Sequence, residues 1–331
     1  MNSTKPDLDG KHVLVTGGTG SFGRRFVRTV LLRFDPARLI VFSRDEQKHY
    51  QMMQELGDPR IRHFVGDVRD LERLNRAFRG VDVVVHAAAT KHIPIAEYNP
   101  FEAIKTNILG TANVIEAAIN QGVKRIVSLS SDKACNPINL YGATKLCGDK
   151  LIVAGNHYCH PDHASFAVVR YGNVIGSKGS VVPAFKEQAK KGVIQITDAR
   201  MTRFWMEVDR GVDLVLTAIA LTSGCEIFIP KIPSMKLLDL ARAIAPDARQ
   251  EIVGIRPGEK LHEMMIPADE ARHSRDFGEF FVIFPATPRS RRPPPEWVNL
   301  GKPVADRFVY SSETNDEWLT VEELRRRVEI L

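Results

Sequence analysis

Four side chains within the segment SSDKACNPINLYGATK (residues 130–145) could move protons. Tyr141 and Lys145 are four residues apart, a spacing that places both on one face of a helix. A phenol, whose pKa is ordinarily about 10, takes a proton from an alcohol at neutral pH only when that pKa is lowered, and the Lys145 ammonium could lower it. Asp132 and Lys133 lie just upstream and add an acid and a base, for which the simple oxidation of an alcohol has no use.

A glycine-rich run, VLVTGGTGSFGRRFV, includes the first apolar segment of the chain and the residues after it. Gly17, Gly20 and Gly23 are three residues apart, and the run also contains the pattern GxGxxG, which begins at Gly18. Glycines let the backbone turn sharply and approach a pyrophosphate, which the N-terminus of the following helix stabilises. We therefore expect a dinucleotide site, with Lys145 on the ribose of a nicotinamide and with contacts from Gly17, Thr19, Gly20, Ser21, Phe22 and Gly23.

The residues after the second apolar segment bear on which dinucleotide binds. In NAD sites an acidic residue about 20 positions further on accepts hydrogen bonds from the ribose hydroxyls. Here the chain reads Ser43, Arg44, Asp45, Glu46, and Lys48 follows. Ser43, Arg44 and Lys48 suit a 2′-phosphate, which Arg can bind with two parallel hydrogen bonds. Asp45 and Glu46 leave NAD open, although acids also suit the start of a helix. We favour NADP.

Further residues are expected along the same cofactor site. Asp67 and Val68 end the third apolar segment, where adenine could bind. Ala87 and Ala88 follow the fourth, where small side chains would let the cofactor pass close to the backbone. The remaining expected cofactor contacts are Lys91, Leu129, Ser130, Tyr141, Lys145 and Val174.

These groups need a scaffold, and alternating apolar runs and helical patterns predict one. Continuous apolar runs without polar alternation are typical of parallel strands that are buried on both faces. The expected strands are His12–Thr16, Leu39–Phe42, His63–Val65, Val81–Ala87, Arg125–Leu129 and Ala167–Tyr171. The expected helices between them are Phe22–Leu32, Asp45–Leu56, Leu71–Phe78, Pro100–Gln121 and Leu140–Ala154. Repeated β-α-β units predict an α/β fold with a Rossmann-like, doubly wound parallel sheet.

The pattern changes after about residue 178, which suggests a second, smaller lobe. We expect residues 1–178 to form an NADP-binding Rossmann domain onto which 204–226 packs back. Residues 179–203 and 227–331 then form a substrate-binding lobe and a C-terminal tail. Helical patterns cover Val181–Lys190, Asp209–Leu221 and the final LTVEELRRRVEIL, while the Pro- and Arg-rich segment 287–297 is expected to be an exposed connection.

Bulk composition favours a soluble enzyme that binds anionic small molecules. The net charge is +6 and 44% of residues are hydrophobic. No nucleic-acid-binding motif accompanies the basic excess, so nucleotides and diphosphates explain it better than nucleic acid. The four cysteines form no CxxC pair, which indicates free thiols in a reducing compartment. Without a signal peptide or a long apolar run, we expect a cytoplasmic protein that is not bound to a membrane. The scattered histidines predict no metal.

Taken together, these motifs resemble the extended short-chain dehydrogenase/reductase superfamily, and the full set narrows the match. TGGTGSFG, SRDEQK, GDVRD, HAAATKHIPIAEYNP, SDKACNPINLYGATKLC, VVRYGNVIGSKGSVVP, MTRFW, IFIPKIPSMK and IRPGEKLHEMM are similar to the soluble, configuration-inverting UDP-N-acetylglucosamine 4,6-dehydratase family. The resemblance extends over nearly the whole chain and both lobes. That family acts at the start of pseudaminic acid synthesis.

The resemblance implies a use for all four proton-handling residues. Tyr141 would take the proton of the sugar C4 hydroxyl while NADP⁺ takes the hydride. Lys133 would then remove the C5 proton, Asp132 would protonate the departing C6 hydroxyl, and the hydride would return to C6. Lys133 must be neutral for this role, so burial and a nearby Lys91 or Lys145 should lower its pKa, whereas the pKa of Asp132 must rise. The alternative is a simple ion pair, in which each charge would stabilise the other.

The resemblance also implies a set of substrate contacts. Arginines suit a diphosphate, and a glutamate could accept hydrogen bonds from a uridine ribose. The expected contacts are Lys91, Ser131, Asn173, Thr197, Met201, Arg203, Arg256 and Glu259, where Ser131 stands in place of the family's usual Thr. Related membrane-bound enzymes that retain the C5 configuration carry Met where Tyr141 stands, so Tyr141 favours inversion. The family further implies a homo-oligomer.

Two other functions stay open on the sequence, besides retention at C5. A nucleotide-sugar 4-epimerase would use the same fold but would not need Asp132 or Lys133. A non-catalytic NADP-sensing module would be expected to lose Tyr141 or Lys145, and both are present.

Overall fold

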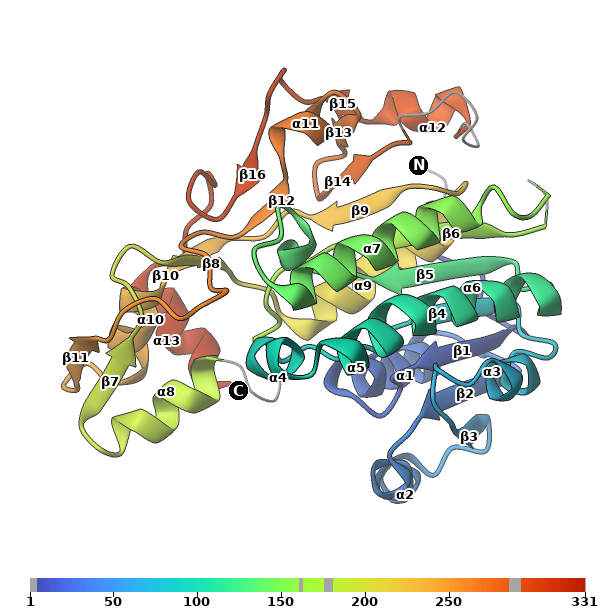
Figure 1. Ribbon diagram of the computed structural model, residues 1–331, viewed down its shortest axis with the longest axis horizontal. Coiled ribbons are helices and arrows are strands. Elements are labelled where there is room, and N and C mark those ends of the chain that lie inside the picture. Colours follow the sequence, from blue (N-terminus) through green and yellow to red (C-terminus); the bar gives the residue numbers. More distant parts are fainter. Residues whose placement is uncertain (1–4, 161–162, 176–180, 286–292, 331) are drawn as a thin grey trace.

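The computed structural model describes residues 5–160, 163–175, 181–285 and 293–330, and in them a ten-stranded sheet forms the centre of the larger lobe (Figure 1). The strand order is β15-β13-β14-β9-β6-β5-β4-β1-β2-β3. The parallel strands are β1 (His12–Thr16), β2 (Arg38–Ser43), β3 (Ile61–Val65), β4 (Val83–His86), β5 (Arg125–Leu129), β6 (Ser165–Val169) and β9 (Ile227–Pro230). An antiparallel edge follows, made of β14 (Phe280–Ile283), β13 (Ser274–Asp276) and β15 (Lys302–Pro303).

Helices cover both faces of this sheet, because successive residues of each buried strand point to opposite sides. On one side Leu14 packs with residues of α3 (Leu71–Ala77), α6 (Gly110–Gln121) and α7 (Leu140–Gly155). On the other side its neighbours Val13 and Val15 pack with residues of α1 (Ser21–Arg33), α2 (Glu46–Leu56) and α9 (Val208–Leu221). The predicted fold class, a doubly wound Rossmann-like sheet, is confirmed.

The predicted helix Pro100–Gln121 is wrong as a single α-helix. It is divided into α5 (Pro100–Ile104), the π-helical turn η1 (Lys105–Leu109) and α6. Asn107, 2% exposed, lies in the π turn, where its side chain bonds the backbone N–H and C=O of Thr90 at 2.8 and 2.9 Å and the Thr144 hydroxyl at 3.0 Å. The turn therefore fastens the loop after β4 to helix α7. The sequence did not predict α4 (Ile93–Tyr98).

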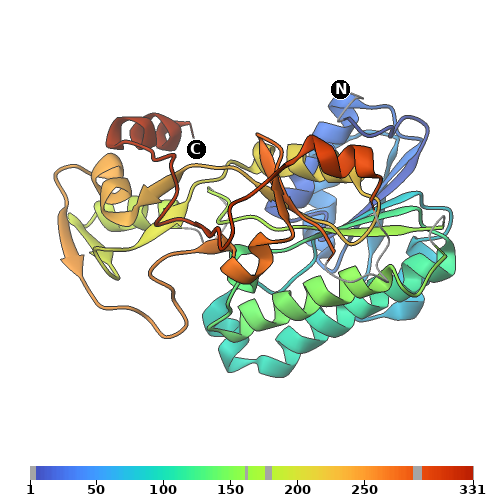
Figure 2. The ribbon, with the colours of Figure 1, turned by 90° about the horizontal axis from the view of Figure 1, so that it is seen from above.

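A smaller lobe lies beside the sheet, as Figures 1 and 2 show. Its core contains Met201, Trp205, Leu240 and Leu324, all nearly inaccessible to solvent. Its elements are α8 (Val181–Ala189), β7 (Val193–Ile196), β8 (Thr202–Phe204), β10 (Ser234–Lys236), α10 (Leu237–Ile244), β11 (Arg249–Ile252) and α13 (Val321–Glu329). Between the lobes lie β12 (Met264–Ile266), which pairs with β16 (Tyr310–Ser311), and the short helix α11 (Ala268–Ala271).

The lobe boundary that we expect at residue 226 differs from the structure. Residues 227–331 are expected in the substrate lobe, whereas four strands from that range, β9, β13, β14 and β15, extend the main sheet. The reason is that β9, fully buried as IFIP, pairs in parallel with β6 and then accepts β14.

The expected exposed connection 287–297 also needs correction. Its residues 287–292 lie outside the described residues, but its end enters α12 (Pro295–Leu300). Trp297 is 9% exposed, and its ring packs against Phe228, Phe277 and Phe284. No helix in the described part of the chain is long and apolar enough to span a membrane.

A tight contact joins the helix that carries Tyr141 and Lys145 to the 3₁₀ turn η2 (Asp132–Ala134). Gly142 in α7 has no room for a side chain, because a Cβ atom there would overlap the carbonyl oxygen of Lys133. Nearby, Ala96 of α4 and Ala103 of α5 form a small buried cluster with Tyr141. Both ends of the segment 130–145 are therefore held by close packing.

We predict that Gly142→Ala lowers the free energy of unfolding by about 1–3 kcal/mol, the range for overpacked sites, although Ala is the better helix former. Gly148→Ala is the matched control, since its Cβ would meet Asn107 O at an ordinary 3.4 Å. Urea unfolding of both variants measures the difference. Equal stability of the two would show that η2 does not pack against α7 in this way.

Candidate active site

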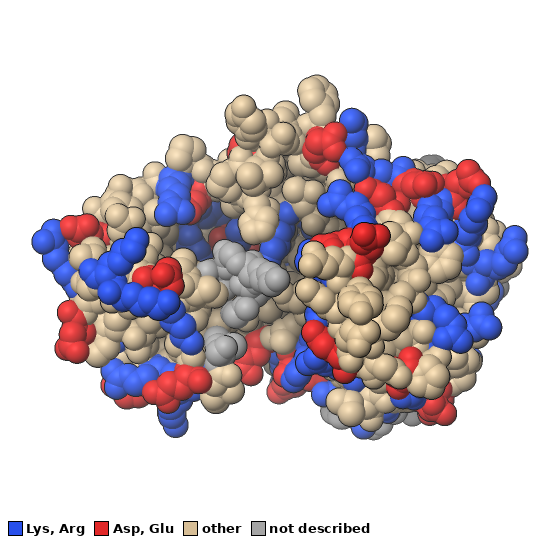
Figure 3. Space-filling model, turned by 90° about the horizontal axis from the view of Figure 1, so that it is seen from below, with Lys and Arg blue, Asp and Glu red and all other residues tan. Residues whose placement is uncertain are grey.

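One cavity of about 1190 Å³ runs along the carboxyl ends of the parallel strands and into the small lobe. Such crevices form where strand order reverses, here between β1 and β4. Its lining includes the basic residues Arg24, Arg44, Lys48, Lys91, Lys133, Lys145, Arg203 and Arg256 and the acidic residues Asp45, Glu55, Asp67 and Glu259. In Figure 3, Lys and Arg side chains border the hollow between the lobes. The excess of cations suits an anionic ligand.

The cavity contains almost all of the predicted cofactor residues. Those that line it are Gly17, Thr19, Gly20, Ser21, Phe22, Gly23, Ser43, Arg44, Asp45, Lys48, Asp67, Val68, Ala87, Ala88, Lys91, Leu129, Ser130, Tyr141, Lys145 and Val174. Glu46 does not line it and is exposed in the first turn of α2, where a carboxylate favours the helix N-terminus.

The glycine-rich turn has the shape that a pyrophosphate requires. Gly17 adopts a left-handed φ of 65°, and a Cβ there would lie 2.9 Å from the backbone nitrogen of Ala88. A Cβ on Gly23 would similarly overlap the turn itself. Gly20 differs, because a Cβ there would meet only Gly17 O, at 3.1 Å. Gly20 is the uncapped N-cap of α1, so the N–H groups of the first turn remain available to an anion.

The end of β2 holds a chain of hydrogen bonds that the sequence did not reveal. The Ser43 hydroxyl lies 2.8 Å from Thr19 Oγ1 and 2.9 Å from His49 Nε2, and His49 Nδ1 lies 3.0 Å from His63 Nδ1. Beside it, Arg44 reaches Asp67 at 3.6 Å and Lys48 reaches Asp45 at 2.5 Å. Arg44 and Lys48 thus line the cavity at the end of β2, each with an acidic neighbour.

The far end of the cavity gathers the predicted substrate residues. Lys91, Ser131, Asn173, Thr197, Arg203, Arg256 and Glu259 all line it. Met201 does not, which corrects that prediction: it is fully buried in the small-lobe core, where its sulfur lies 3.1 Å from Thr197 Oγ1. Met201 therefore supports the wall of the cavity from behind.

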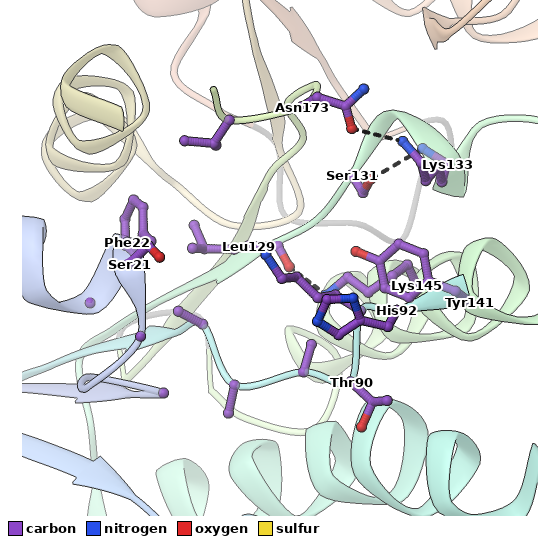
Figure 4. Close-up of a pocket in the computed structure, with 18 of the residues that line it drawn as sticks. Ser21, Phe22, Thr90, His92, Leu129, Ser131, Lys133, Tyr141, Lys145 and Asn173 are labelled. Atoms are coloured by element: carbon purple, nitrogen blue, oxygen red, sulfur yellow. Dashed lines mark hydrogen bonds between the residues drawn. The ribbon is translucent and has the colours of Figure 1, made fainter. Parts of the chain in front are cut away.

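Tyr141 and Lys145 face the cavity from α7, as predicted, but their electrostatics differ from the expectation (Figure 4). Burial raises the pKa of Tyr141, and the cation that opposes this is Lys133 rather than Lys145. The Tyr141 hydroxyl points toward Ser131, whose hydroxyl also favours a lower pKa of Tyr141. Lys145 donates to Leu129 O at 2.6 Å, and burial lowers its own pKa.

Asp132 and Lys133 form the ion pair that the sequence analysis kept as the alternative. Lys133 Nζ lies 3.1 Å from Asp132 Oδ1 and 3.1 Å from Asn173 Oδ1. The expected lowering of the Lys133 pKa is wrong. Burial favours a lower pKa, but the negative charges of Asp132 and Glu263 outweigh it, so the pKa of Lys133 is raised above its usual value. The cation that opposes them is Arg203, not Lys91 or Lys145. For Asp132, fully buried, the pKa is raised as expected, first by burial and then by Glu263.

Glu263 is the residue of this site that the sequence analysis missed. It is 2% exposed, and its Oε1 lies 3.2 Å from Lys133 Nζ. In the sequence it stands within LHEMM, more than a hundred residues from Lys133, and nothing in that motif marks it as part of the site.

A substitution can separate cofactor binding from folding at the glycine-rich turn. We predict that Gly20→Val weakens dinucleotide binding at least about tenfold, or about 1.4 kcal/mol, because its side chain would project into the cavity. Its melting temperature should stay near that of the wild type. Gly23→Ala is the comparison, since its Cβ would strike the turn and should lower stability as well. Calorimetric titration and thermal unfolding measure both, and unchanged binding by Gly20→Val would place the pyrophosphate elsewhere.

Comparison with known proteins identifies the family. Residues 13–285 match the model of the polysaccharide biosynthesis protein family. The chain is 50% identical over 320 residues to the UDP-N-acetylglucosamine 4,6-dehydratase (inverting) of Campylobacter jejuni, covering 95% of this chain and 96% of that one. A UDP-glucose 4-epimerase of Rickettsia conorii is 39% identical, over 95% and 94% of the two chains.

A solved structure agrees with this assignment. Pen from Bacillus thuringiensis superimposes with a TM-score of 0.88 at 36% identity, over 98% of both chains. The chain therefore belongs to the polysaccharide biosynthesis protein family and is an enzyme of the extended short-chain dehydrogenase/reductase type, grouped with the inverting UDP-N-acetylglucosamine 4,6-dehydratases.

Proposed function

We propose that the enzyme converts UDP-N-acetylglucosamine to UDP-2-acetamido-2,6-dideoxy-β-L-arabino-hex-4-ulose, with NADP as its cofactor. The observation that carries this proposal is that Tyr141, Lys145 and Lys133 line one cavity and that buried Asp132 pairs with Lys133 behind its wall, in a chain 50% identical to an inverting dehydratase. A bound NADP⁺ would supply the hydride acceptor for C4 oxidation and, once reduced, the hydride donor for C6. The steps below concern the side chains of this chain.

The first task of the site is to remove the C4 hydroxyl proton. Tyr141 is the candidate base, since it lines the cavity near Ser131. Burial raises its pKa, so the positive charge of Lys133 is needed to favour the phenolate. Lys145, bonded to Leu129 O, is placed to bind the nicotinamide ribose and to fix the helix face that carries Tyr141.

The second task is the elimination of water across C5 and C6, after the C4 ketone has made the C5 proton acidic. Lys133 removes that proton and Asp132 protonates the departing C6 oxygen. The observed ion pair is compatible with these roles, because transfer of one proton from Lys133 to Asp132 gives a neutral amine and a neutral acid with the same total number of protons. Burial of Asp132 favours this neutral form.

The substrate-facing residues fit a sugar diphosphate. Arg203 and Arg256 line the small-lobe end of the cavity and could bind the diphosphate, and Glu259 lies beside Arg256, at 4.0 Å. Reprotonation of C5 on the opposite face gives inversion, the outcome named for the Campylobacter relative. A place as the first step of pseudaminic acid synthesis, assembly into a homo-oligomer and a cytoplasmic location remain predictions from the family resemblance.

Incubation with UDP-N-acetylglucosamine in D₂O, followed by NMR of the product, tests this proposal. We expect a 6-deoxy-4-keto sugar with deuterium at C5 and the inverted C5 configuration. Asp132→Asn should slow elimination by about 10²–10⁴-fold, the usual contribution of a general acid, while hydride transfer from C4 to the cofactor continues. A retained C5 configuration would assign the enzyme to the other class of dehydratase.

A second candidate, a nucleotide-sugar 4-epimerase, is favoured by one observation, the 39% identity to the Rickettsia relative that bears that name. The same NMR experiment distinguishes it. A C4 epimer without solvent deuterium, formed at an equal rate by Asp132→Asn, would establish epimerisation and exclude dehydration.

The preference for NADP rests on Arg44, which lines the cavity and is largely exposed beside Asp67. We predict that Arg44→Ala raises the Kd for NADP by about tenfold or more, the effect of losing a charged hydrogen bond, and leaves the Kd for NAD nearly unchanged. Arg28→Ala is the control, because Arg28 is also an exposed arginine paired with an acid, Glu55, but does not line the cavity. Calorimetric titration with both dinucleotides decides, and equal losses for NAD and NADP would refute a 2′-phosphate contact.

A further inference from the structure

The backbone of Glu263 is held in place by two other parts of the chain. Its N–H donates to Ser312 Oγ at 2.9 Å, and its carbonyl accepts from the Ser312 N–H at 2.8 Å. Ser312 Oγ in turn lies 2.8 Å from Thr202 Oγ1 of β8. The adjacent His262 side chain turns to Thr202 and Glu313. The Glu263 carboxylate is therefore fixed in position where the two lobes meet.

That carboxylate completes the surroundings of the Lys133 ammonium. An ammonium has three N–H donors. Lys133 Nζ has three acceptors within reach: Asp132 Oδ1 at 3.1 Å, Asn173 Oδ1 at 3.1 Å and Glu263 Oε1 at 3.2 Å (Figure 4 shows Lys133 and Asn173). With all three in use, Lys133 is held in one orientation. As an ammonium it has no lone pair with which to act as a base.

Each of the two carboxylates beside Lys133 keeps one oxygen without a partner. Among the described residues, Asp132 Oδ2 and Glu263 Oε2 are buried and accept no hydrogen bond. A buried acceptor without a donor is costly, and such groups call for a reason. For Asp132 Oδ2, the proposed protonation of the sugar C6 oxygen explains why this oxygen is left without a partner in the protein. Glu263 has no step assigned to it, yet it is nearly as deeply buried.

The charges around Glu263 keep it anionic. Burial would raise its pKa, but Lys133 of η2, Arg203 of β8 and Lys260 of its own segment lower it below its usual range. Arg203 Nε lies 3.7 Å from Glu263 Oε1. The negative charge of Glu263 acts on both members of the Asp132–Lys133 pair, because it raises the pKa of Asp132 and the pKa of Lys133.

Tyr141 feels this charge less directly. Burial raises its pKa, and the main charged groups that act on it are Lys133, Asp132 and Asp149. The charge of Glu263 acts first on the pair proposed for the elimination, and it reaches the residue proposed for oxidation through Lys133. This division makes the role of Glu263 testable one step at a time.

We propose that Glu263 is a positioning residue for the elimination step, which holds the Lys133 amine between two carboxylates and sets, by its own negative charge, the pH range in which Asp132 and Lys133 exchange protons with the sugar. This inference rests on the dehydratase function proposed above. The proposed role requires no contact between Glu263 and the sugar, because Glu263 acts through Lys133 and Asp132.

Removal of the charge has a definite sign. Without the anion, the Asp132 acid deprotonates at lower pH and the Lys133 ammonium also deprotonates at lower pH. Both limbs of the pH profile of elimination therefore move to lower pH in Glu263→Gln. We expect a shift of at least about one pH unit, the size that a neighbouring charge produces, and elimination at least about tenfold slower. The pH profile of C4 oxidation should move less than that of elimination, because Glu263 reaches Tyr141 through the charge of Lys133.

The experiment follows both half-reactions of the NADP-loaded enzyme with UDP-N-acetylglucosamine across pH. Cofactor absorbance in a single turnover reports C4 oxidation, and deuterium incorporation at C5 reports elimination. Glu263→Asp keeps the charge on a shorter side chain, so it should slow elimination but retain the wild-type pH optimum. Glu226→Gln is the matched control, because Glu226 is also fully buried but its carboxylate accepts hydrogen bonds from Thr222, Ser223 and Gly224 in the turn before β9.

The outcomes separate this inference from the proposed function. If the wild type forms no dehydrated product from UDP-N-acetylglucosamine, the proposed function fails. If the wild type does so but Glu263→Gln keeps its pH optimum, or Glu226→Gln shifts it equally, the role of Glu263 is only structural and the inference is overturned. Should Glu263→Gln not fold, Glu263→Asp decides alone: an unchanged elimination rate or a shifted optimum would overturn the inference.

Discussion

The arrangement of the active site depends on one buried cation, the ammonium of Lys133. A charge removed from water is costly unless it is paired and fully hydrogen bonded, and Lys133 meets this condition with acceptors from three separate parts of the chain. Asp132 comes from the turn after β5, Asn173 from the loop after β6 and Glu263 from the crossing before β12. These three segments are consequently held at fixed positions around one nitrogen atom, and this end of the cavity is built on them.

The second constraint is close backbone packing around helix α7. Gly142 lets the helix lie directly against the carbonyl of Lys133, and the π turn at Asn107 fastens α7 to the loop after β4. Tyr141 is thereby fixed relative to Lys133, whose charge is the one that favours its phenolate. The two pairs of proton-handling residues are coupled by geometry and by charge, although they were recognised in the sequence as separate pairs.

Features set by local pattern could be predicted from the sequence. The strand His12–Thr16, the glycine turn, and the spacing of Tyr141 and Lys145 depend on residues close together in the chain, and the structure places all of them as expected. Long-range features could not be predicted in this way. Glu263 reaches Lys133 only through the fold, and Met201 turns into the small-lobe core. The direction of the Tyr141 pKa shift follows from burial, and that of Lys133 depends in part on the distant Glu263. Even the family resemblance, which named the reacting groups, did not show that Asp132 and Lys133 rest as an ion pair.

The route of the chain between the lobes has a consequence for how the molecule folds. After β6 the chain enters the small lobe, and it returns to the large lobe at α9. It leaves the large lobe again after β9 and comes back to it for β13 and β14. The last helix, α13, belongs to the small lobe. Contacts between residues distant in sequence therefore dominate both lobes, and neither lobe is one continuous piece of chain. Such a topology favours slow folding, because long loops must close before the contacts form. The cavity is lined by residues of both lobes, so its shape depends on segments from several separate parts of the chain.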